Sequence, residues 1–561
     1  MKPLVIVCLL FSSIHCIPVA NKTNPTPSEN FPFHATLDTD GNFLLYWKFN
    51  ATHITFETHV RTKGYVGFGF STNGKMFPAD VVTGWIKDGV PHFQDRHTVG
   101  HSPPVVDASQ DWFLLHGEEN GFGTVLKMIR KLDTCDPNDM KISNDTIRAI
   151  FAYSPNDPAD DNSITYHGPT HRGAKSLMLL TRTKIPAIPS DALTKDFLND
   201  NYHVPANDTT YSCRIFSLAD ITKKHHVVKF EPIIQTGHVP FVHHIVVMKC
   251  PAVDPSLIGY QYMCDTGKVK PCGNAWVAWA TGGEAFYFPD NVGLPVGEPG
   301  DTDVIIMQTH YNNPGLKTGI VDSSGMRITY TPTLRHHDAG CLSTGVLVNP
   351  WQLVPPGIQD FRSAGFCPKE CLSKGLSNMK SGINVFGILQ HAHLLARGIR
   401  TRIYRKGVEL APLAVDEHYD FDYQDFRYVH GERTVLDGDE IVTECKYDST
   451  GRKGITIGGE STSQEMCLSF MFYYPRMVID TCEAVPKFDN IDPDFTKMSK
   501  KLFHMDFTNK TVVDEYMHLL NTTRYLTYCA GATLQPNYTI GEGFLPRPTK
   551  EYVEPSTCPH S

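Results

Sequence analysis

A small set of side chains in this sequence has the types and spacing of metal ligands. His391 and His393 directly follow residues 383–389, an apolar run that predicts a buried strand. Because residues i and i+2 of a strand point to the same face, the two imidazoles would aim at one point. Neutral imidazole is a ligand for copper, zinc, iron and nickel, so the pattern indicates a metal site.

Two further groups add to this hypothesis. His243 and His244 are adjacent in a strand-like segment, and His310 lies near the end of the predicted strand 303–311. Met466 offers a thioether, a soft donor that selects Cu(I) over zinc. We therefore expect two separate three-ligand copper pockets, formed by His243, His244 and His310 and by His391, His393 and Met466.

Three histidine pairs compete as ligands, at 225–226, 243–244 and 336–337, and spacing does not rank them. Neighbouring strand residues face opposite ways, so two adjacent ligands require a bulge or a strand end. Val239 and Pro240 lie just upstream of the middle pair and favour an irregular strand start there.

The rest of the chain must supply the strands that position these residues. At 561 residues it is too long for one core, and we expect three domains. Short strands alternate with turns and long helical periods are absent, which predicts an all-β fold. The net charge of −9 gives no support to nucleic-acid binding and is typical of a solvated acidic surface.

The N-terminus predicts export. Residues 1–16 have the lysine, the apolar core and the small and polar residues of a signal peptide, and no later apolar run is long enough to span a membrane. The cysteines beyond this segment should mostly be paired in an oxidising compartment. We expect a protein that is secreted or lies in the lumen of the secretory pathway. N-glycosylation motifs occur at Asn21, Asn50, Asn144, Asn207, Asn509, Asn521 and Asn537.

We expect domains at residues 34–153, 190–332 and 334–482, followed by a tail at residues 483–561. A proline-rich connector follows the first domain, and we expect a short helix within residues 190–199.

Two sets of motifs resemble known families. Residues 64–71 and 79–85 resemble the DOMON domain. The motifs at 242–245, 308–311, 391–394 and 465–467 occur in the order found in the copper type II, ascorbate-dependent monooxygenases, and they are most similar to its DBH-like branch. The resemblance implies an all-β architecture, with a DOMON-like β-sandwich followed by two antiparallel jelly-roll-like β-sandwich copper domains.

The resemblance also implies roles. His243, His244 and His310 would hold an electron-transfer copper. The second set, His391, His393 and Met466, would hold the copper where O₂ and substrate react. Ascorbate would restore one electron to each copper, and the second oxygen atom would leave as water. Tyr211 and His391 match active-site positions of the family, although Tyr211 also fits a strand tyrosine packed beside Cys213. Tyr473 fits the core first, and the pairs at 225–226 and 336–337 would not be ligands.

The family's cysteine pattern implies a set of disulfides that leaves Cys341 as a free thiol. A bridge beside Met466 would hold that weak ligand in place. The implied pairs are Cys213–Cys264, Cys250–Cys272, Cys367–Cys482, Cys371–Cys529, Cys445–Cys467 and Cys135–Cys558.

The substrate is less well defined by the sequence. Peptide-amidating relatives grip a peptide carboxylate through polar side chains at positions where this chain has Leu389, Leu468 and Phe470. We therefore expect a small, largely apolar substrate, with arylalkylamines included. The alternatives are a peptide hydroxylase and a catalytically silent secreted glycoprotein that binds ligands. The sequence leaves the oligomeric state open.

Overall fold

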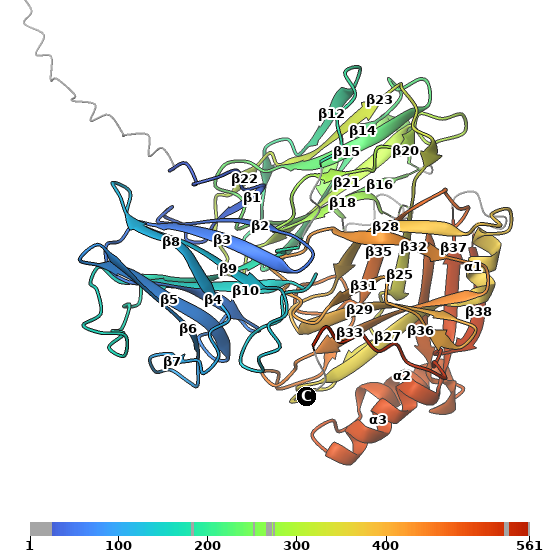
Figure 1. The fold of residues 1–561 in the computed structure, drawn as a ribbon. Helices are drawn as coiled ribbons and strands as arrows, with labels where there is room; N and C mark the ends of the chain where they lie inside the picture. The colour runs from blue at the N-terminus through green and yellow to red at the C-terminus, as the bar shows by residue number, and fades with distance from the viewer. Residues whose placement is uncertain are drawn as a thin grey trace, which may run out of the picture.

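The protein folds into three β-sheet units, which Figure 1 shows at the left (blue), the upper right (green) and the lower right (yellow to red). A computed structural model describes residues 25–180, 185–250, 253–264, 272, 275–531 and 538–558. The predicted signal peptide, Asn21 and Asn537 lie outside the described residues. Almost all strand pairs are antiparallel, so the all-β prediction is confirmed.

The first unit is a sandwich of two sheets whose inner faces share one core. One sheet has the order β1 (Phe33–Thr36), β2 (Phe43–Phe49), β3 (His53–Val60), β9 (Thr124–Lys131) and β8 (Phe113–Glu119). The other has the order β11 (Arg172–Leu177), β10 (Ile147–Tyr153), β4 (Val66–Ser71), β5 (Ala79–Lys87), β6 (Val90–His97) and β7 (Val105–Val106). Phe43, Phe56, Phe68 and Phe151 fill the space between the sheets.

The second unit carries the first histidine set. One of its sheets has the order β17 (Gln261–Met263), β14 (Thr209–Ser217), β21 (Val304–Asn312), β16 (Val242–Lys249) and β18 (Ala275–Ala280). The other has the order β12 (Leu193–Leu198), β23 (Gly325–Thr331), β15 (His225–Ile233), β20 (Val292–Val296) and β24 (His337–Asp338), with β19 (Phe286–Tyr287) beside β15. Two short strands, β13 (Tyr202–His203) and β22 (Val321–Asp322), form a separate pair.

The third unit carries the His-x-His motif. Its larger sheet has the order β32 (Arg427–Val435), β28 (Ile383–His391), β35 (Leu468–Tyr474), β25 (Gly340–Val346), β36 (Thr481–Lys487), β37 (Arg524–Ala530) and β38 (Tyr538–Phe544). The facing sheet has the order β27 (Phe361–Cys367), β33 (Asp439–Tyr447), β29 (Ala396–Arg405) and β30 (Val408–Glu409), with β31 (Ala414–Asp416) beside β29. A short pair joins β26 (Leu353–Val354) and β34 (Thr456–Ile457).

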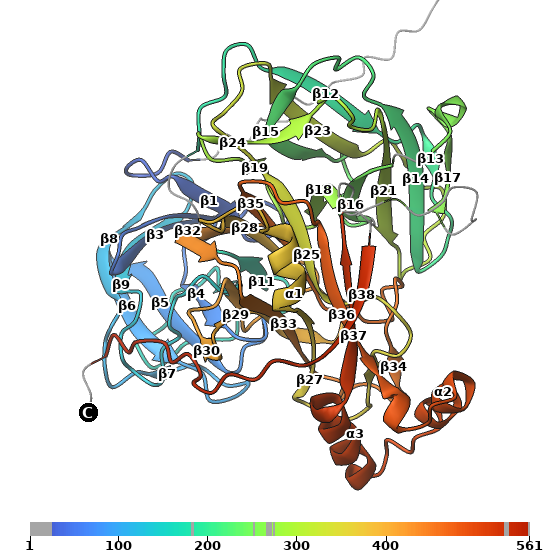
Figure 2. The same cartoon turned by 90° about the vertical axis from the view of Figure 1, so that its right-hand side faces the viewer.

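Much of the segment expected to be a tail is regular structure that belongs to the third unit. Strands β37 and β38 extend its larger sheet, and the helices α2 (Phe495–Phe503) and α3 (Lys510–Thr522) project beside it (Figure 2). The apolar face of α3 packs Val513, Tyr516 and Leu520 into a core cluster of the third unit. A third helix, α1 (Lys369–Gly375), follows β27.

The prediction of a short helix within residues 190–199 is wrong. Residues Leu193–Leu198 form β12, which pairs along its length with β23. Phe197 is fully buried and its neighbours are more exposed, so the segment has the alternation of an edge strand.

Disulfides tie distant parts of the chain together. The six bonds are Cys135–Cys558, Cys213–Cys264, Cys250–Cys272, Cys367–Cys482, Cys371–Cys529 and Cys445–Cys467. Cys341 is the free thiol among the described cysteines. No helix in the described part of the chain has the length and apolar character needed to cross a bilayer.

The second and third units share a hydrophobic core. Phe286 of β19 stacks on Phe472 of β35, with ring centroids 5.2 Å apart, and on Tyr428 of β32 at 5.0 Å. Leu389 and Phe426 belong to the same cluster. Because aromatic packing continues across the boundary, the two units hold their ligand-bearing strands in fixed relation.

Candidate metal centre

The first histidine set is built by two neighbouring antiparallel strands. In β16 and β21, His244 lies directly opposite His310. The register shifts between Val242 and His244, so His243 occupies a bulge. An inserted residue re-aims its side chain, which is how two adjacent histidines come to share one face.

The Nδ1 atoms of this set converge. His244 Nδ1 lies 3.3 Å from His243 Nδ1 and 3.4 Å from His310 Nδ1. Two of the far nitrogens have other partners, because His243 Nε2 donates to the Phe421 carbonyl at 3.1 Å and His310 Nε2 lies 3.1 Å from the Thr462 hydroxyl. This arrangement leaves three Nδ1 lone pairs for one ion, the donor set that copper accepts.

The second pair of histidines lies where β28 ends. His391 is the last residue of β28, and His393 lies in the turn that follows it, with ring centroids 5.3 Å apart. His391 Nδ1 donates to Gln424 Oε1 at 2.7 Å, and His393 Nδ1 donates to the Gln464 carbonyl at 3.1 Å. His393 Nε2 is buried and has no hydrogen-bond partner in the described part of the chain. A buried imidazole nitrogen without a hydrogen-bond partner fits a metal ligand, and the bond from His393 Nδ1 to a carbonyl fixes the orientation of the ring.

All five imidazoles are held neutral. Burial, with a smaller contribution from His391, lowers the pKa of His243 and of His393 to about 3. Burial also lowers the pKa of His391, and burial with neighbouring histidines lowers those of His244 and His310 well below the usual range. Neutral imidazole is the form that binds metal.

These pKa shifts predict that the copper-free protein loses stability in acid. The unfolded chain binds protons near pH 6.5 and the folded site binds them only at lower pH, so the free energy of unfolding falls as the pH drops from about 6.5 towards 3. Each such histidine contributes a slope of up to about 1.4 kcal/mol per pH unit. Replacing His310 with asparagine should reduce the slope by about that amount between pH 6 and pH 4, measured by denaturant unfolding. An unchanged slope would contradict the conclusion that His310 is neutral in the folded protein.

Glu465 links the two segments that carry the second ligand set. Its carboxylate is fully buried and accepts the backbone N–H groups of His393 at 3.0 Å, Leu395 at 2.6 Å and Met466 at 3.2 Å. Burial raises the pKa of Glu465 to about 7, although these three N–H groups oppose the shift. The Cys445–Cys467 bond holds the residue after Met466 to β33. The Met466 side chain is half-buried.

The two sets of histidines adjoin. The ring centroids of His244 and His391 are 5.5 Å apart, with the rings perpendicular. The hydrophobic core that the two units share holds the end of β28 near β16.

A loop between β31 and β32 touches both sets. The Phe421 ring stacks on His243 at 4.0 Å, and the Phe421 carbonyl accepts from His243 Nε2. Gln424 donates its Nε2 to that same carbonyl at 2.8 Å and accepts from His391 through Oε1. A continuous hydrogen-bonded chain therefore runs from His391 through Gln424 and Phe421 to His243. The Tyr419 hydroxyl completes the contact by donating to the Ala392 carbonyl at 2.6 Å.

The same loop is docked on the first unit. Asp416 accepts from the backbone and hydroxyl of Thr146 at 3.1 and 2.7 Å, and Arg148 donates to the His418 carbonyl at 2.6 Å. The Tyr423 hydroxyl accepts from the Met178 backbone at 3.1 Å. The N-terminal sandwich thus fixes the loop that orients ligands of both sets.

Gln424 was not singled out by the sequence, and its geometry predicts a large functional effect. Gln424→Leu keeps the volume but removes the bond to His391 and the bond to the Phe421 carbonyl. Outer partners of metal ligands contribute about 10–100-fold to metal affinity or activity, so we expect losses of that size in copper titrations and in turnover. Gln424→Glu keeps the acceptor for His391 and should lose less. Equal loss in both variants would argue against the orienting role.

The structure also shows where the other tyrosines and histidines that the sequence singled out lie. Tyr211 stacks on His310 at 4.6 Å and donates its hydroxyl to the Glu460 carbonyl at 2.6 Å, so it braces a ligand. Tyr473 is buried and donates to the Ile479 carbonyl at 3.2 Å. Both ring nitrogens of His226 have partners, in Asp338 and the Arg335 backbone. His336 Nδ1 lies 3.1 Å from His337 Nε2, and His336 is exposed while His337 is half-buried.

The strands beside His391 present apolar side chains. Leu468 lies opposite His391 and Leu389 lies opposite Phe470 in the β28–β35 pairing. Leu389 and Leu468 are buried and Phe470 is half-buried. This side of the site offers no ionic partner from these positions.

Sequence comparisons agree with this geometry. The N-terminal and C-terminal domains of the copper type II ascorbate-dependent monooxygenase family match residues 195–318 and 337–492, and the DOMON domain matches residues 39–154. The chain belongs to this family of copper monooxygenases.

Its relatives include named members of the DBH-like group. The chain is 40% identical over 467 residues to DBH-like monooxygenase protein 1 of Mus musculus, covering 82% of this chain and 76% of that protein. It is 33% identical over 487 residues to dopamine beta-hydroxylase of Bos taurus, covering 85% and 78%. Among solved structures, the cytochrome b domain of pyranose dehydrogenase from Coprinopsis cinerea covers 25% of this chain and 79% of that chain, at 13% identity and a TM-score of 0.22, too distant to support an argument.

Proposed function

We propose that this protein is a dicopper, ascorbate-dependent monooxygenase that hydroxylates a C–H bond of a small, largely apolar molecule with O₂. The observation that supports the proposal most is the adjoining pair of buried, neutral histidine sets, each with ring nitrogens left for a metal. Copper, when bound, supplies one-electron redox chemistry and O₂ activation.

The chain's own residues have distinct tasks in this proposal. His243, His244 and His310 hold the electron-transfer copper through Nδ1, while His391 and His393 hold the other copper through Nε2 with Met466 as the third ligand. Gln424 and the Gln464 carbonyl keep the proton on Nδ1 of the second pair, so that Nε2 carries the lone pair. Tyr211 acts by packing on His310.

The proposed substrate is apolar near its reacting carbon. Leu389, Leu468 and Phe470 replace polar anchors that a peptide carboxylate would need, which disfavours a peptide substrate. An arylalkyl group fits the apolar side chains on β28 and β35, and arylalkylamines are the first class to test.

Metal analysis followed by oxygen uptake tests the proposal. Purified protein should bind about two coppers per chain, and ascorbate-dependent O₂ uptake should rise with an arylalkylamine but not with a glycine-extended peptide. Gln424→Glu, assayed beside the native chain, should retain part of the copper binding and part of the O₂ uptake. Two bound coppers with no uptake across arylalkylamines and uncharged arylalkanes would favour the catalytically silent alternative.

We also propose that the protein is exported to an oxidising compartment. Its six disulfides are typical of secreted and lumenal proteins. Glycans at the described motifs would be compatible with folding, because the asparagines are exposed: Asn50, Asn144, Asn207, Asn509 and Asn521.

A further inference from the structure

The first unit contains a cavity of about 580 Å³, a size that suits a drug-sized ligand. It lies on the outer face of the sheet β11-β10-β4-β5, opposite the sandwich core. All of Ile150, Phe151 and Ala152 of β10 line the cavity, but only Phe151 belongs to the core cluster, so Ile150 and Ala152 take the outward positions of this strand. Ala152 pairs with Gly67 and Ile150 pairs with Gly69, so small residues leave a recess in this face.

The floor of the cavity is apolar where an outer face is normally polar. An antiparallel sheet that covers a core on one side usually presents polar residues to solvent on the other. Here the outward positions include Val81, Ile150, Ala152 and Ala174. An apolar outer face that is roofed by loops is a feature of a binding site.

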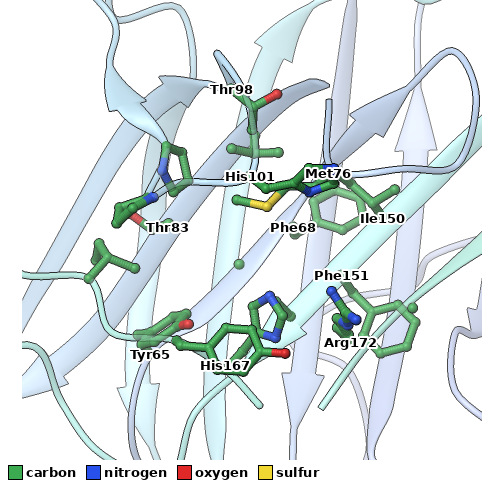
Figure 3. A pocket seen from close by; sticks show the side chains of 18 of the residues that line it. Tyr65, Phe68, Met76, Thr83, Thr98, His101, Ile150, Phe151, His167 and Arg172 are labelled. Atoms are coloured by element: carbon green, nitrogen blue, oxygen red, sulfur yellow. The ribbon is translucent and has the colours of Figure 1, made fainter. Parts of the chain in front are cut away.

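Loops from three parts of the chain wall the cavity. Figure 3 shows Met76 and His101 on one side, and Tyr65 and His167 on the other. His167 Nδ1 donates to the Gly168 carbonyl at 2.7 Å, and burial lowers its pKa, so the ring is kept neutral. The Tyr65 hydroxyl donates to the Thr165 carbonyl at 2.7 Å. The walls are thus held by internal hydrogen bonds, which preorganises the cavity.

The charges at the cavity have one sign. Lys75 and Arg172 line it and are exposed. No aspartate or glutamate occurs among the described residues that line it, although the whole chain carries a net charge of −9. Cationic side chains on the lining of an apolar recess, with no carboxylate among the described lining residues, favour an anionic group on an apolar body.

We propose that this cavity binds a small amphipathic carboxylate, with the apolar body against β4, β5 and β10 and the carboxylate paired with a cation of the lining, Lys75 or Arg172. The site shares no residue with the two histidine sets, so binding does not depend on copper. The ligand would be held by the N-terminal unit whether or not the monooxygenase proposal holds.

Fluorescence titration with dansyl-labelled undecanoic acid tests this site on the full chain. The acid should bind saturably, one per chain, and about tenfold more tightly than its methyl ester, because the ester lacks the charge-assisted bonds. Arg172→Gln with Lys75→Gln should bring the acid down to the affinity of the ester. Lys131→Gln removes an exposed cation outside the cavity and should leave the titration unchanged.

A second variant tests the apolar floor. Ala152→Trp fills the recess and should abolish binding of both probes, and Ala174→Trp, at an exposed position of β11, serves the same purpose if the first variant does not fold. Copper-loaded and copper-free protein should give the same curves. Equal affinity for acid and ester, or binding that survives both tryptophan variants, would overturn the proposal.

Discussion

Replacing Met466 with alanine should abolish turnover and lower the copper content from about two per chain to about one. The expectation follows from where the two ligand sets are built. The Nδ1 atoms of His243, His244 and His310 converge from β16 and β21 of the second unit. The segment before Met466 contacts this set through the Thr462 hydroxyl, which lies beside His310 Nε2 and not beside Nδ1. The second set would be left with two imidazoles and no soft donor, which weakens its hold on Cu(I).

Two measurements separate this outcome from general damage. Copper content is determined by atomic absorption, and X-ray absorption of the reduced protein should lose its sulfur scattering. Met379→Ala, a methionine packed against a different cluster of the third unit, should retain both coppers. Loss of both metals together in Met466→Ala would contradict the division into two sets.

Glu465→Ala should be among the most destabilising single substitutions in the third unit. The carboxylate accepts three buried N–H groups, and each one left unsatisfied costs about 1–3 kcal/mol. The sum is comparable with the whole free energy of unfolding of a typical domain, about 5–15 kcal/mol. We expect a sharp fall in the denaturant midpoint and in the yield of folded protein.

Glu465→Gln keeps the prediction testable if the alanine variant does not fold. The amide retains one oxygen acceptor but turns a donor towards one of the three N–H groups, so its stability should be intermediate. It should also bind copper at the second set more tightly than Glu465→Ala does, because Oε2 accepts from both His393 and Met466 and the amide oxygen can take that place. Native stability in Glu465→Ala would show that the three N–H groups find other partners.

The sequence was informative where ligand chemistry and strand geometry act together. The adjacent histidines demanded a bulge, and β16 has its register shift at His243. The short strands and turns predicted the all-β fold. The pairing of His244 with His310 depends on which strands become neighbours, and only the order of the motifs in the family pointed to it.

The orienting residues were harder to find because they act through position and not through type. Phe421 contributes a backbone carbonyl, which any residue possesses. Gln424 is an ordinary polar side chain in a loop, and nothing local indicates that it bonds a histidine 33 residues away. Glu465 follows a run of polar residues, and its place directly before the candidate ligand Met466 is the one signal that the sequence offers.

Segments at sheet edges were also difficult to predict. Strand β12 has one fully buried side chain, Phe197, so its pattern is too weak to separate an edge strand from a short helix. Strands β37 and β38 extend the outer end of the larger sheet, and β38, with two glycines and mostly exposed residues, has little apolar pattern to indicate a strand.

The bond between Cys135 and Cys558 spans 423 residues of sequence and closes most of the polypeptide into a covalent ring. A protease cut in the connector between the first and second units would open that ring without releasing either piece. Nicked protein would therefore migrate as one band on a gel run without reductant and as two bands after reduction. Reduction, and not cleavage, would be the event that frees the N-terminal sandwich from its covalent tether.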